Sequence, residues 1–181
     1  MGESCEIKMK IKSRRYDVEE TLFSALVDEF DGFDDLYVGD DALAEFEQGE
    51  TIELGTEGVL NIDENKVEIV YQESELTGME GSETVVFFSK DDPGFVSMTR
   101  SGTVSTALVF ERGKRHHCVY NTPIMPFEIC VHTLKVQNSI LSCGKLELDY
   151  IIEIRGAKAE RTKFEIILMK DGTKEKDEAF A

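Results

Sequence analysis

The stretch "KLELDYIIEIR", residues 145–155, has the residue pattern of a β-strand with one apolar face. Successive side chains in a strand point to opposite faces of a sheet, so residues two positions apart lie on the same face. Charged side chains, among them Glu147, Asp149 and Glu153, occupy one face, and Ile151 is the one exception there. The other face carries Leu146, Leu148, Tyr150, Ile152 and Ile154. This alternation predicts a strand that packs one face against a core.

Segments with the same alternation fill most of the chain. Nine of them lie between residues 51 and 170, separated by turn signals rich in Gly, Asp and Pro. A further strand is predicted at "CEIKMKIKSR", residues 5–14. Many short strands joined by short turns are typical of an antiparallel sandwich or barrel, and closure into a barrel removes aggregation-prone edges. We therefore expect an all-β, antiparallel, up-and-down barrel of about eight to ten strands.

One segment near the N-terminus has a helical pattern instead. In "YDVEETLFSALVDEF", residues 16–30, Asp17 is placed to cap a helix and Glu20 to complete a capping box. The apolar residues that recur at helical spacing are Val18, Leu22, Phe23, Leu26, Val27 and Phe30. We expect an amphipathic helix over residues 17–30 that covers part of the barrel surface. An irregular acidic loop is expected to follow it to residue 50.

The length of 181 residues suits a single domain, 1–181, with a polar tail at 171–181. No apolar run approaches the roughly 20 residues of a membrane-spanning helix. The first ten residues lack the apolar region of a signal peptide. We therefore expect a cytoplasmic protein whose four cysteines are reduced thiols.

The negative charge is concentrated in one segment. Residues 16–65 contain 17 acidic residues and no Lys or Arg, which leaves 37 − 17 = 20 acidic residues against 20 basic ones elsewhere. This segment thus accounts for the whole net charge of −17. Such a field repels nucleic acids and anionic membranes, so neither is expected as a partner. Two interpretations stay open: a solvated acidic surface, or a docking surface for a basic protein partner.

The stretch "HHCVYNTPIMPFEICVHT", residues 116–133, contains all three histidines and two of the four cysteines. It predicts a hairpin, and a hairpin centred on Ile124 would bring four metal-ligand side chains to one face. These are His116, Cys118, Cys130 and His132. A register shift of one residue would separate them, and the paired spacing of zinc sites is absent. We therefore expect an ordinary hairpin without a metal, whose opposite face joins the core through Val119, Phe127, Ile129 and Val131.

No catalytic signature is present. The sequence lacks a nucleophile elbow, a P-loop and a dinucleotide-binding glycine motif. A calcium loop starting at Asp34 fails because its third and fifth positions are Leu36 and Val38. Glu73 and Glu75 would share a face at a strand end, but a carboxylate pair on so acidic a surface is usually solvated. We expect no enzyme activity and no cofactor.

Arg100 is the most informative candidate for a binding residue. In "GFVSMTR", residues 94–100, it shares a face with Val96 and Met98, so that its guanidinium would lie in an apolar lumen. A buried charge needs a partner, because its desolvation is expensive. Three alternatives remain: an anionic ligand, an internal carboxylate such as Glu73, or a side chain that reaches out to solvent.

Several of these residues also carry a family resemblance. The strand ending in Tyr71 and Glu73, the run Arg100-Ser101-Gly102, the turn at residues 120–123 and the strand of Tyr150 resemble the YwiB-like proteins. That bacterial family has no known function and is placed among the calycins, which are lipocalin-like β-barrels. The resemblance covers roughly residues 50–170 and the first strand. It implies an up-and-down barrel, of which the helix and acidic loop at 17–50 would be an elaboration, and it implies no reaction.

The resemblance also suggests a type of site. Fatty-acid-binding calycins hold a ligand carboxylate with Arg and Tyr side chains inside the barrel, and Arg100 with Tyr71 and Tyr150 looks similar. We expect non-enzymatic binding of a small apolar or carboxylate-bearing, amphiphilic molecule in the lumen, with Arg100, Tyr71, Tyr150 and Glu73 as the ligand-binding residues. The alternative is a protein-interaction module that uses the acidic helix and loop and has a barrel filled by its own side chains.

Overall fold

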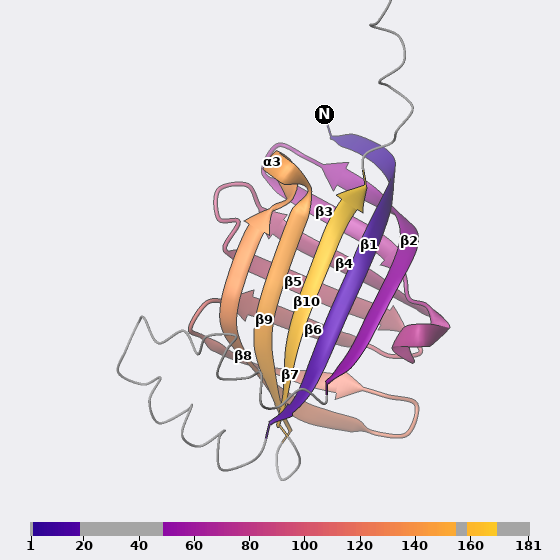
Figure 1. The fold of residues 1–181 in the computed structure, drawn as a ribbon, viewed down its shortest axis with the longest axis vertical. Coiled ribbons are helices and arrows are strands. Elements are labelled where there is room, and N and C mark those ends of the chain that lie inside the picture. The colour runs from indigo at the N-terminus through magenta and orange to yellow at the C-terminus, as the bar shows by residue number, and fades with distance from the viewer. Residues whose placement is uncertain (1, 19–48, 155–158, 170–181) are drawn as a thin grey trace, which may run out of the picture.

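Ten antiparallel strands form one sheet that curls into a nearly closed barrel (Figure 1). The computed structural model describes residues 2–18, 49–154 and 159–169. The strands are β1 (Glu3–Val18), β2 (Glu50–Ile62), β3 (Lys66–Gln72), β4 (Ser82–Ser89), β5 (Phe95–Gly102), β6 (Thr106–Glu111), β7 (Arg115–Asn121), β8 (Pro126–Ser139), β9 (Lys145–Ile154) and β10 (Ala159–Met169). Within the described ranges two short helices accompany them, η2 (Glu75–Thr77) and α3 (Ile140–Cys143).

The topology is up-and-down. The sheet order is β6-β5-β4-β3-β2-β1-β10-β9-β8-β7, so strands that follow one another in sequence pair with each other except β6 and β7, and β1 also pairs with β10. No ladder joins the two end strands β6 and β7, which meet through one isolated bridge between Ser105 and Asn121. The turn between them is tied to β8 by the Gly113 N–H, which donates to the Thr133 carbonyl at 2.8 Å. The expected all-β antiparallel barrel of about eight to ten strands is thus confirmed, with ten strands in the sheet.

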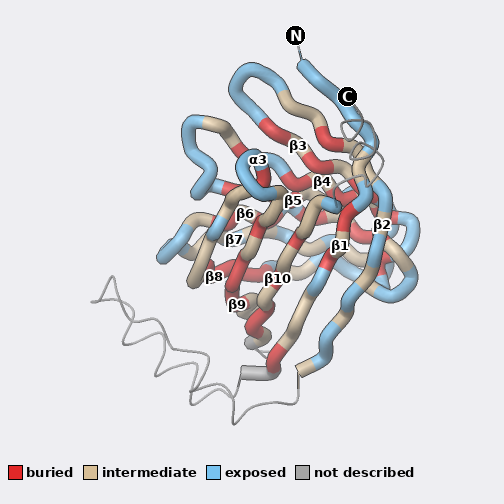
Figure 2. The backbone as a smooth tube through the Cα atoms, turned by 45° about the horizontal axis from the view of Figure 1, so that its top comes forward, coloured by how far each residue is buried: buried red, intermediate tan, exposed pale blue. Residues whose placement is uncertain are grey.

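The apolar alternation determines the inside of the barrel. In β9, Leu146, Leu148 and Tyr150 are buried in a single core to which nearly every strand contributes. Buried and less buried residues alternate along the strands in Figure 2. The strand predicted at residues 145–155 is therefore correct for the described part, with its apolar face toward the lumen.

The predicted helix start is wrong. Asp17 and Val18 belong to β1 and pair with Glu160 and Ala159 of β10. The capping pattern is overridden because the backbone of these residues is held in the ladder with β10. The remainder of the predicted helix, the acidic loop as far as residue 48 and the tail from residue 171 lie outside the described residues.

The predicted register of the β7–β8 hairpin is also wrong by one residue. Cys118 lies opposite Ile129, and His117 lies opposite Cys130, so the two cysteines point to opposite faces of the sheet. The same shift places Val119 outside the core, with 46% of its surface exposed. The physical reason lies in the turn, where Asn121 pairs with Pro126 and four residues remain between the strands.

The side chain of Thr122 stabilises that turn. Its Oγ1 accepts hydrogen bonds from the backbone N–H groups of Ile124 at 3.3 Å and Met125 at 3.2 Å. A hairpin register follows from its turn geometry, so these local contacts determine which residues face each other along both strands.

The outer face of the sheet contains a buried ion pair that the sequence pattern did not reveal. Asp149 in β9 accepts two hydrogen bonds from Arg161 in β10, from Nε at 2.8 Å and from Nη2 at 2.6 Å. Both side chains are almost fully buried, as is the outward-facing Ile151. Asp149 and Arg161 therefore lie on the polar face of their strands without being exposed to solvent.

No helix among the described residues has the length and apolar character needed to cross a membrane.

Candidate functional site

A cavity of about 280 Å³ lies inside the barrel, and every strand except β4 contributes to its wall. Much of the wall is apolar and includes Ile11, Leu54, Leu108, Phe127, Ile129 and Phe164. All four side chains expected to bind a ligand, namely Arg100, Tyr71, Tyr150 and Glu73, line it too. The structure thus brings these four residues together in one place.

Arg100 points into this cavity because of the alternation along β5. Val96 and Met98, four and two residues earlier on the same face, are fully buried. Arg100 lies opposite Thr84 of β4, and 11% of its side chain is exposed. The alternative in which Arg100 extends to solvent is excluded.

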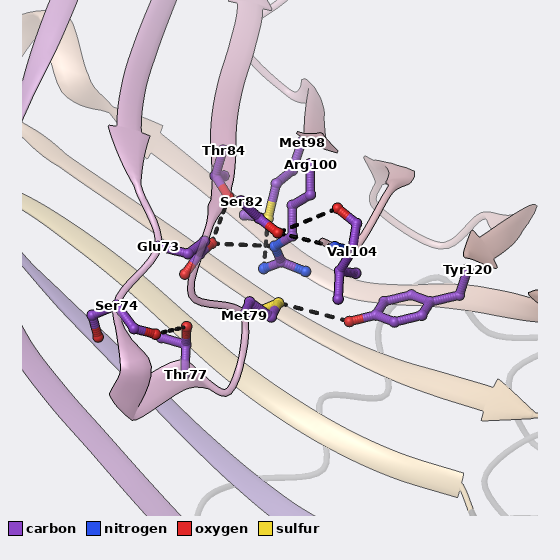
Figure 3. A network of polar contacts seen from close by, with 10 residues as sticks. All are labelled: Glu73, Ser74, Thr77, Met79, Ser82, Thr84, Met98, Arg100, Val104 and Tyr120. Carbon is purple, nitrogen blue, oxygen red and sulfur yellow. Dashed lines mark hydrogen bonds and ion pairs between the residues drawn. The ribbon is translucent and has the colours of Figure 1, made fainter. Parts of the chain in front are cut away.

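Glu73 is the partner of Arg100. Its Oε1 lies 3.3 Å from Nε of Arg100 and also accepts a hydrogen bond from Oγ1 of Thr84 at 2.5 Å (Figure 3). Only 3% of its side chain is exposed. The Glu73 N–H donates to the carbonyl of Ser82 at 2.8 Å, so the backbone just beyond β3 is held beside β4. Two adjacent strands therefore position the carboxylate for the guanidinium.

The pair leaves polar atoms available to the cavity. Nη2 of Arg100 lies 3.3 Å from the sulfur of Met98, a weak acceptor. Among the described residues, no group donates a hydrogen bond to Oε2 of Glu73, and none accepts one from Nη1 of Arg100. The pair is neutral as a whole, yet it offers both N–H donors and a carboxylate acceptor.

Tyr71 and Tyr150 add two neutral hydroxyl groups. Their exposed fractions are 3% and 4%. Burial raises the pKa of Tyr71, and the negative charge of Glu73 raises it further. Burial likewise raises the pKa of Tyr150. For Arg100, burial lowers the pKa, but Tyr71, Tyr150 and Glu73 outweigh it and the net shift is upward. At neutral pH the phenols are uncharged and the guanidinium is charged.

Tyr120 is a lining residue that the sequence analysis did not assign to the site. Its hydroxyl donates to the sulfur of Met79 at 3.7 Å (Figure 3). Its ring stacks on Phe127 with centroids 5.3 Å apart. Met79 follows η2 and is buried. Tyr120 and Cys118 share the inward face of β7, and this face can be identified only once the hairpin register is known.

Glu75 does not join Glu73. The chain leaves β3 after Gln72 and enters η2 at Glu75, so the two carboxylates do not follow a strand alternation. Ser74 begins η2 by accepting a hydrogen bond from the N–H of Leu76 at 3.2 Å. Glu75 is exposed while Glu73 is buried, and the predicted shared face is wrong.

A second ion pair lies in the wall of the same cavity. Nε of Arg15 in β1 is 3.8 Å from Oε1 of Glu160 in β10, and 34% and 38% of these side chains are exposed. Both residues line the cavity, so its more solvated part is also electrically balanced. Within the described residues there is no group of three or more His, Cys, Asp or Glu side chains arranged to hold a metal ion.

Fold and site together define a class: a nearly closed antiparallel β-barrel with a largely apolar internal cavity and a buried Arg–Glu pair. The family is defined by sequence: residues 42–166 match the family described as "Domain of unknown function (DUF1934)". The chain belongs to this family.

A solved structure shares the fold. The crystal structure of the ywiB protein from Bacillus subtilis superposes with a TM-score of 0.60 at 17% sequence identity, over 91% of this chain and 94% of that one. The resemblance to the YwiB-like proteins is therefore confirmed, and at this identity it establishes the fold alone. None of the curated proteins matches this chain.

Proposed function

We propose that the barrel binds one small, mostly apolar molecule in its lumen, in the manner of the lipocalin-like calycins, and that it catalyses no reaction. The observation that carries the proposal is the cavity itself, with its apolar wall and its few buried polar groups. Binding sites for small molecules typically combine a predominantly apolar lining with a small number of polar groups that orient the ligand.

The size of the cavity limits the ligand. An apolar cavity of about 150 Å³ is enough to bind benzene. The cavity here measures about 280 Å³, so it suits a molecule of roughly twice that size. This favours compact molecules over long-chain lipids.

The alternative, a protein-interaction module, requires no cavity. Small barrels are either filled by their own side chains or hold one small ligand. Here Ile52, Leu54, Ile152 and Ile154 are only partly buried although they line the lumen, which supports the ligand-binding proposal. A basic protein partner for the acidic segment stays a separate expectation, and residues 19–48 of that segment lie outside the described part.

Native mass spectrometry of the purified protein, followed by titration with small aromatic and aliphatic compounds, tests the proposal. A Leu54→Trp variant should weaken binding at least tenfold, because the larger side chain occupies the lumen. Leu141→Trp is the matched control, since Leu141 lies in α3 with 53% of its surface exposed. It should bind as the wild type does.

Two results would refute the proposal. One is the absence of binding below about 1 mM for every compound, which corresponds to less than about 4 kcal/mol of affinity. The other is binding that Leu54→Trp and Leu141→Trp affect equally, because the ligand would then occupy a surface and not the lumen.

A further inference from the structure

We propose that the ligand carries an uncharged amide-type head group, with a carbonyl acceptor and an N–H donor, which binds the Arg100–Glu73 pair. This inference rests on the proposed function and adds the chemical class of the ligand. It departs from the carboxylic acids that the sequence pattern of Arg and Tyr suggested.

The first argument concerns charge. A guanidinium without a partner in an apolar lumen would call for an anionic ligand, because a buried charge must be compensated. In this structure Glu73 already compensates Arg100 across 3.3 Å, and both side chains are nearly buried. A ligand carboxylate would make the group net negative and would lie next to Glu73. Close like charges in a poorly solvated site repel each other strongly.

The second argument concerns hydrogen bonding. An ionised carboxylate only accepts hydrogen bonds, whereas an amide both donates and accepts them. The pair presents the Nη1 donor of Arg100 and the Oε2 acceptor of Glu73, neither of which is used by another described residue. An amide carbonyl suits the former and an amide N–H suits the latter. A carboxylate would place an acceptor against Oε2, and a plain hydrocarbon would leave both atoms unpaired.

The remaining polar groups agree with an uncharged ligand. Tyr71 and Tyr150 are buried phenols, and their raised pKa values keep them neutral. Arg15, the other cation in the cavity wall, lies 3.8 Å from the carboxylate of Glu160. Neither cation of the cavity is thus left without a carboxylate. The net charge of −17 further disfavours the approach of anions.

The experiment compares pairs of compounds that differ only in the head group. We would titrate the full-length protein with 3-phenylpropanamide and 3-phenylpropanoate, and with hexanamide and hexanoate, by isothermal calorimetry at pH 7.5. Each amide should bind at least tenfold more tightly than its carboxylate. When the pH is lowered toward the pKa of the free acid, the affinity of the acid should rise, because its neutral form has a donor.

A substitution reverses the preference. Glu73→Gln removes the compensating charge, so Arg100 should now favour the carboxylate, and the ratio of the two affinities should move at least tenfold in that direction. Glu83→Gln is the matched control: it makes the same chemical change in β4, and Glu83 contacts Gln72 on the exposed surface at 2.9 Å. It should keep the wild-type preference. If Glu73→Gln does not fold, the wild-type comparison still decides.

The outcomes separate the two proposals. Amides that bind more tightly than carboxylates support both. Carboxylates that bind the wild type as tightly as amides, or more tightly, overturn the head-group inference and leave lumen binding intact. An unchanged preference in a folded Glu73→Gln variant also overturns the head-group inference. Failure of every compound to bind overturns the proposed function itself.

Discussion

Arg100 and Glu73 show how much depends on a single contact. The alternation along β5 places Arg100 in the lumen, but only Glu73, 27 positions away, makes its charge tolerable there. A buried ion pair contributes little net stability compared with apolar residues of similar size, whereas a single remaining partner is strongly destabilising. The consequences of substitution therefore depend on which partner is removed.

Arg100→Met should lower the free energy of unfolding by about 3 kcal/mol, because it leaves the Glu73 carboxylate buried without a cation. Urea denaturation monitored by circular dichroism measures this. The double variant Arg100→Met with Glu73→Gln should recover part of the loss. A single variant as stable as the wild type would mean that Glu73 is not ionised in the folded state.

The buried phenols imply a pH dependence at the alkaline end. The pKa of Tyr71 is raised by burial in the folded state, while an unfolded tyrosine ionises near about 10. Above that pH the unfolded chain has lost a proton that the folded chain retains. Stability is therefore fully present below about pH 10 and falls as the pH rises further, by up to about 1.4 kcal/mol per pH unit for one group.

Urea denaturation between pH 8 and 11.5 tests this prediction, and Tyr71→Phe should flatten the fall. Tyr16→Phe offers a control at a tyrosine outside the cavity. If the free energy of unfolding fell equally steeply with pH in the wild type and in Tyr71→Phe, the pH dependence could not be assigned to Tyr71.

At the level of secondary-structure elements, close approach between strands is as important as propensity. Gly58 of β2 lies opposite Tyr71 of β3, where β2 begins to pair with β3 as well as with β1. A Cβ at Gly58 would lie 2.5 Å from the carbonyl oxygen of Val70 and 2.5 Å from Cε of Met9. At Gly55 in the same strand, a Cβ would meet nothing within 4 Å.

Gly58→Ala should therefore destabilise the barrel by about 1–3 kcal/mol, because the backbone of β3 must move. Gly55→Ala should cost nothing measurable, since the site is open and alanine reduces the entropy of the unfolded chain. Thermal unfolding of the two variants measures the difference. Equal effects would show that the approach of β2 to β3 is looser in solution.

The ion pairs on the outer face should also contribute differently to stability, because one is buried and others are partly exposed. Asp149→Ala should cost about 3 kcal/mol because it breaks a buried, bidentate pair with Arg161. Glu147→Ala in the same strand should cost less than about 1 kcal/mol, because its contacts with Lys135 and Lys145 are partly exposed. Denaturant titration measures the loss of stability in each variant. Similar losses for Asp149→Ala and Glu147→Ala would show that burial of the ion pair makes no difference.

At the scale of the whole molecule, the neighbouring strands around the barrel are not all joined in the same way. From β6 round to β7 every neighbouring pair of strands is joined by a hydrogen-bonded ladder. Among the described residues the seam between β6 and β7 has no such ladder. It is joined by the backbone bridge between Ser105 and Asn121 and by side-chain contacts, in one of which Nε2 of His116 lies 3.4 Å from Oε2 of Glu111. The ring of His116 also meets Phe95 edge to face, with centroids 6.4 Å apart.

Amide hydrogen exchange should therefore be faster in β6 and β7 than in the central strands β1 and β10, because local opening is easier where few backbone hydrogen bonds must break. Exchange monitored by mass spectrometry or NMR measures this. Protection of β6 and β7 equal to that of β1 would mean that the seam is as tightly closed as the rest of the barrel.

The strand assignments and the antiparallel barrel were predictable because they depend on local patterns. Alternation with a period of two identifies a strand and its apolar face without reference to any other part of the chain. That pattern also placed Arg100, Tyr71 and Tyr150 on inward faces. The same local signals misassigned Asp17 and Val18, because the pairing with β10 outweighed a capping motif.

The sequence by itself determined the all-β antiparallel architecture, the inward faces of most strands and, among the lining residues, Arg100, Tyr71 and Tyr150. Only the tertiary structure decided which side chains meet: Glu73 with Arg100, Asp149 with Arg161, and Cys118 apart from Cys130. The physical reason is that alternation is a property of each strand alone. Register and partnership depend on turns and on contacts between strands distant in sequence, where a shift of one residue moves every side chain to the opposite face.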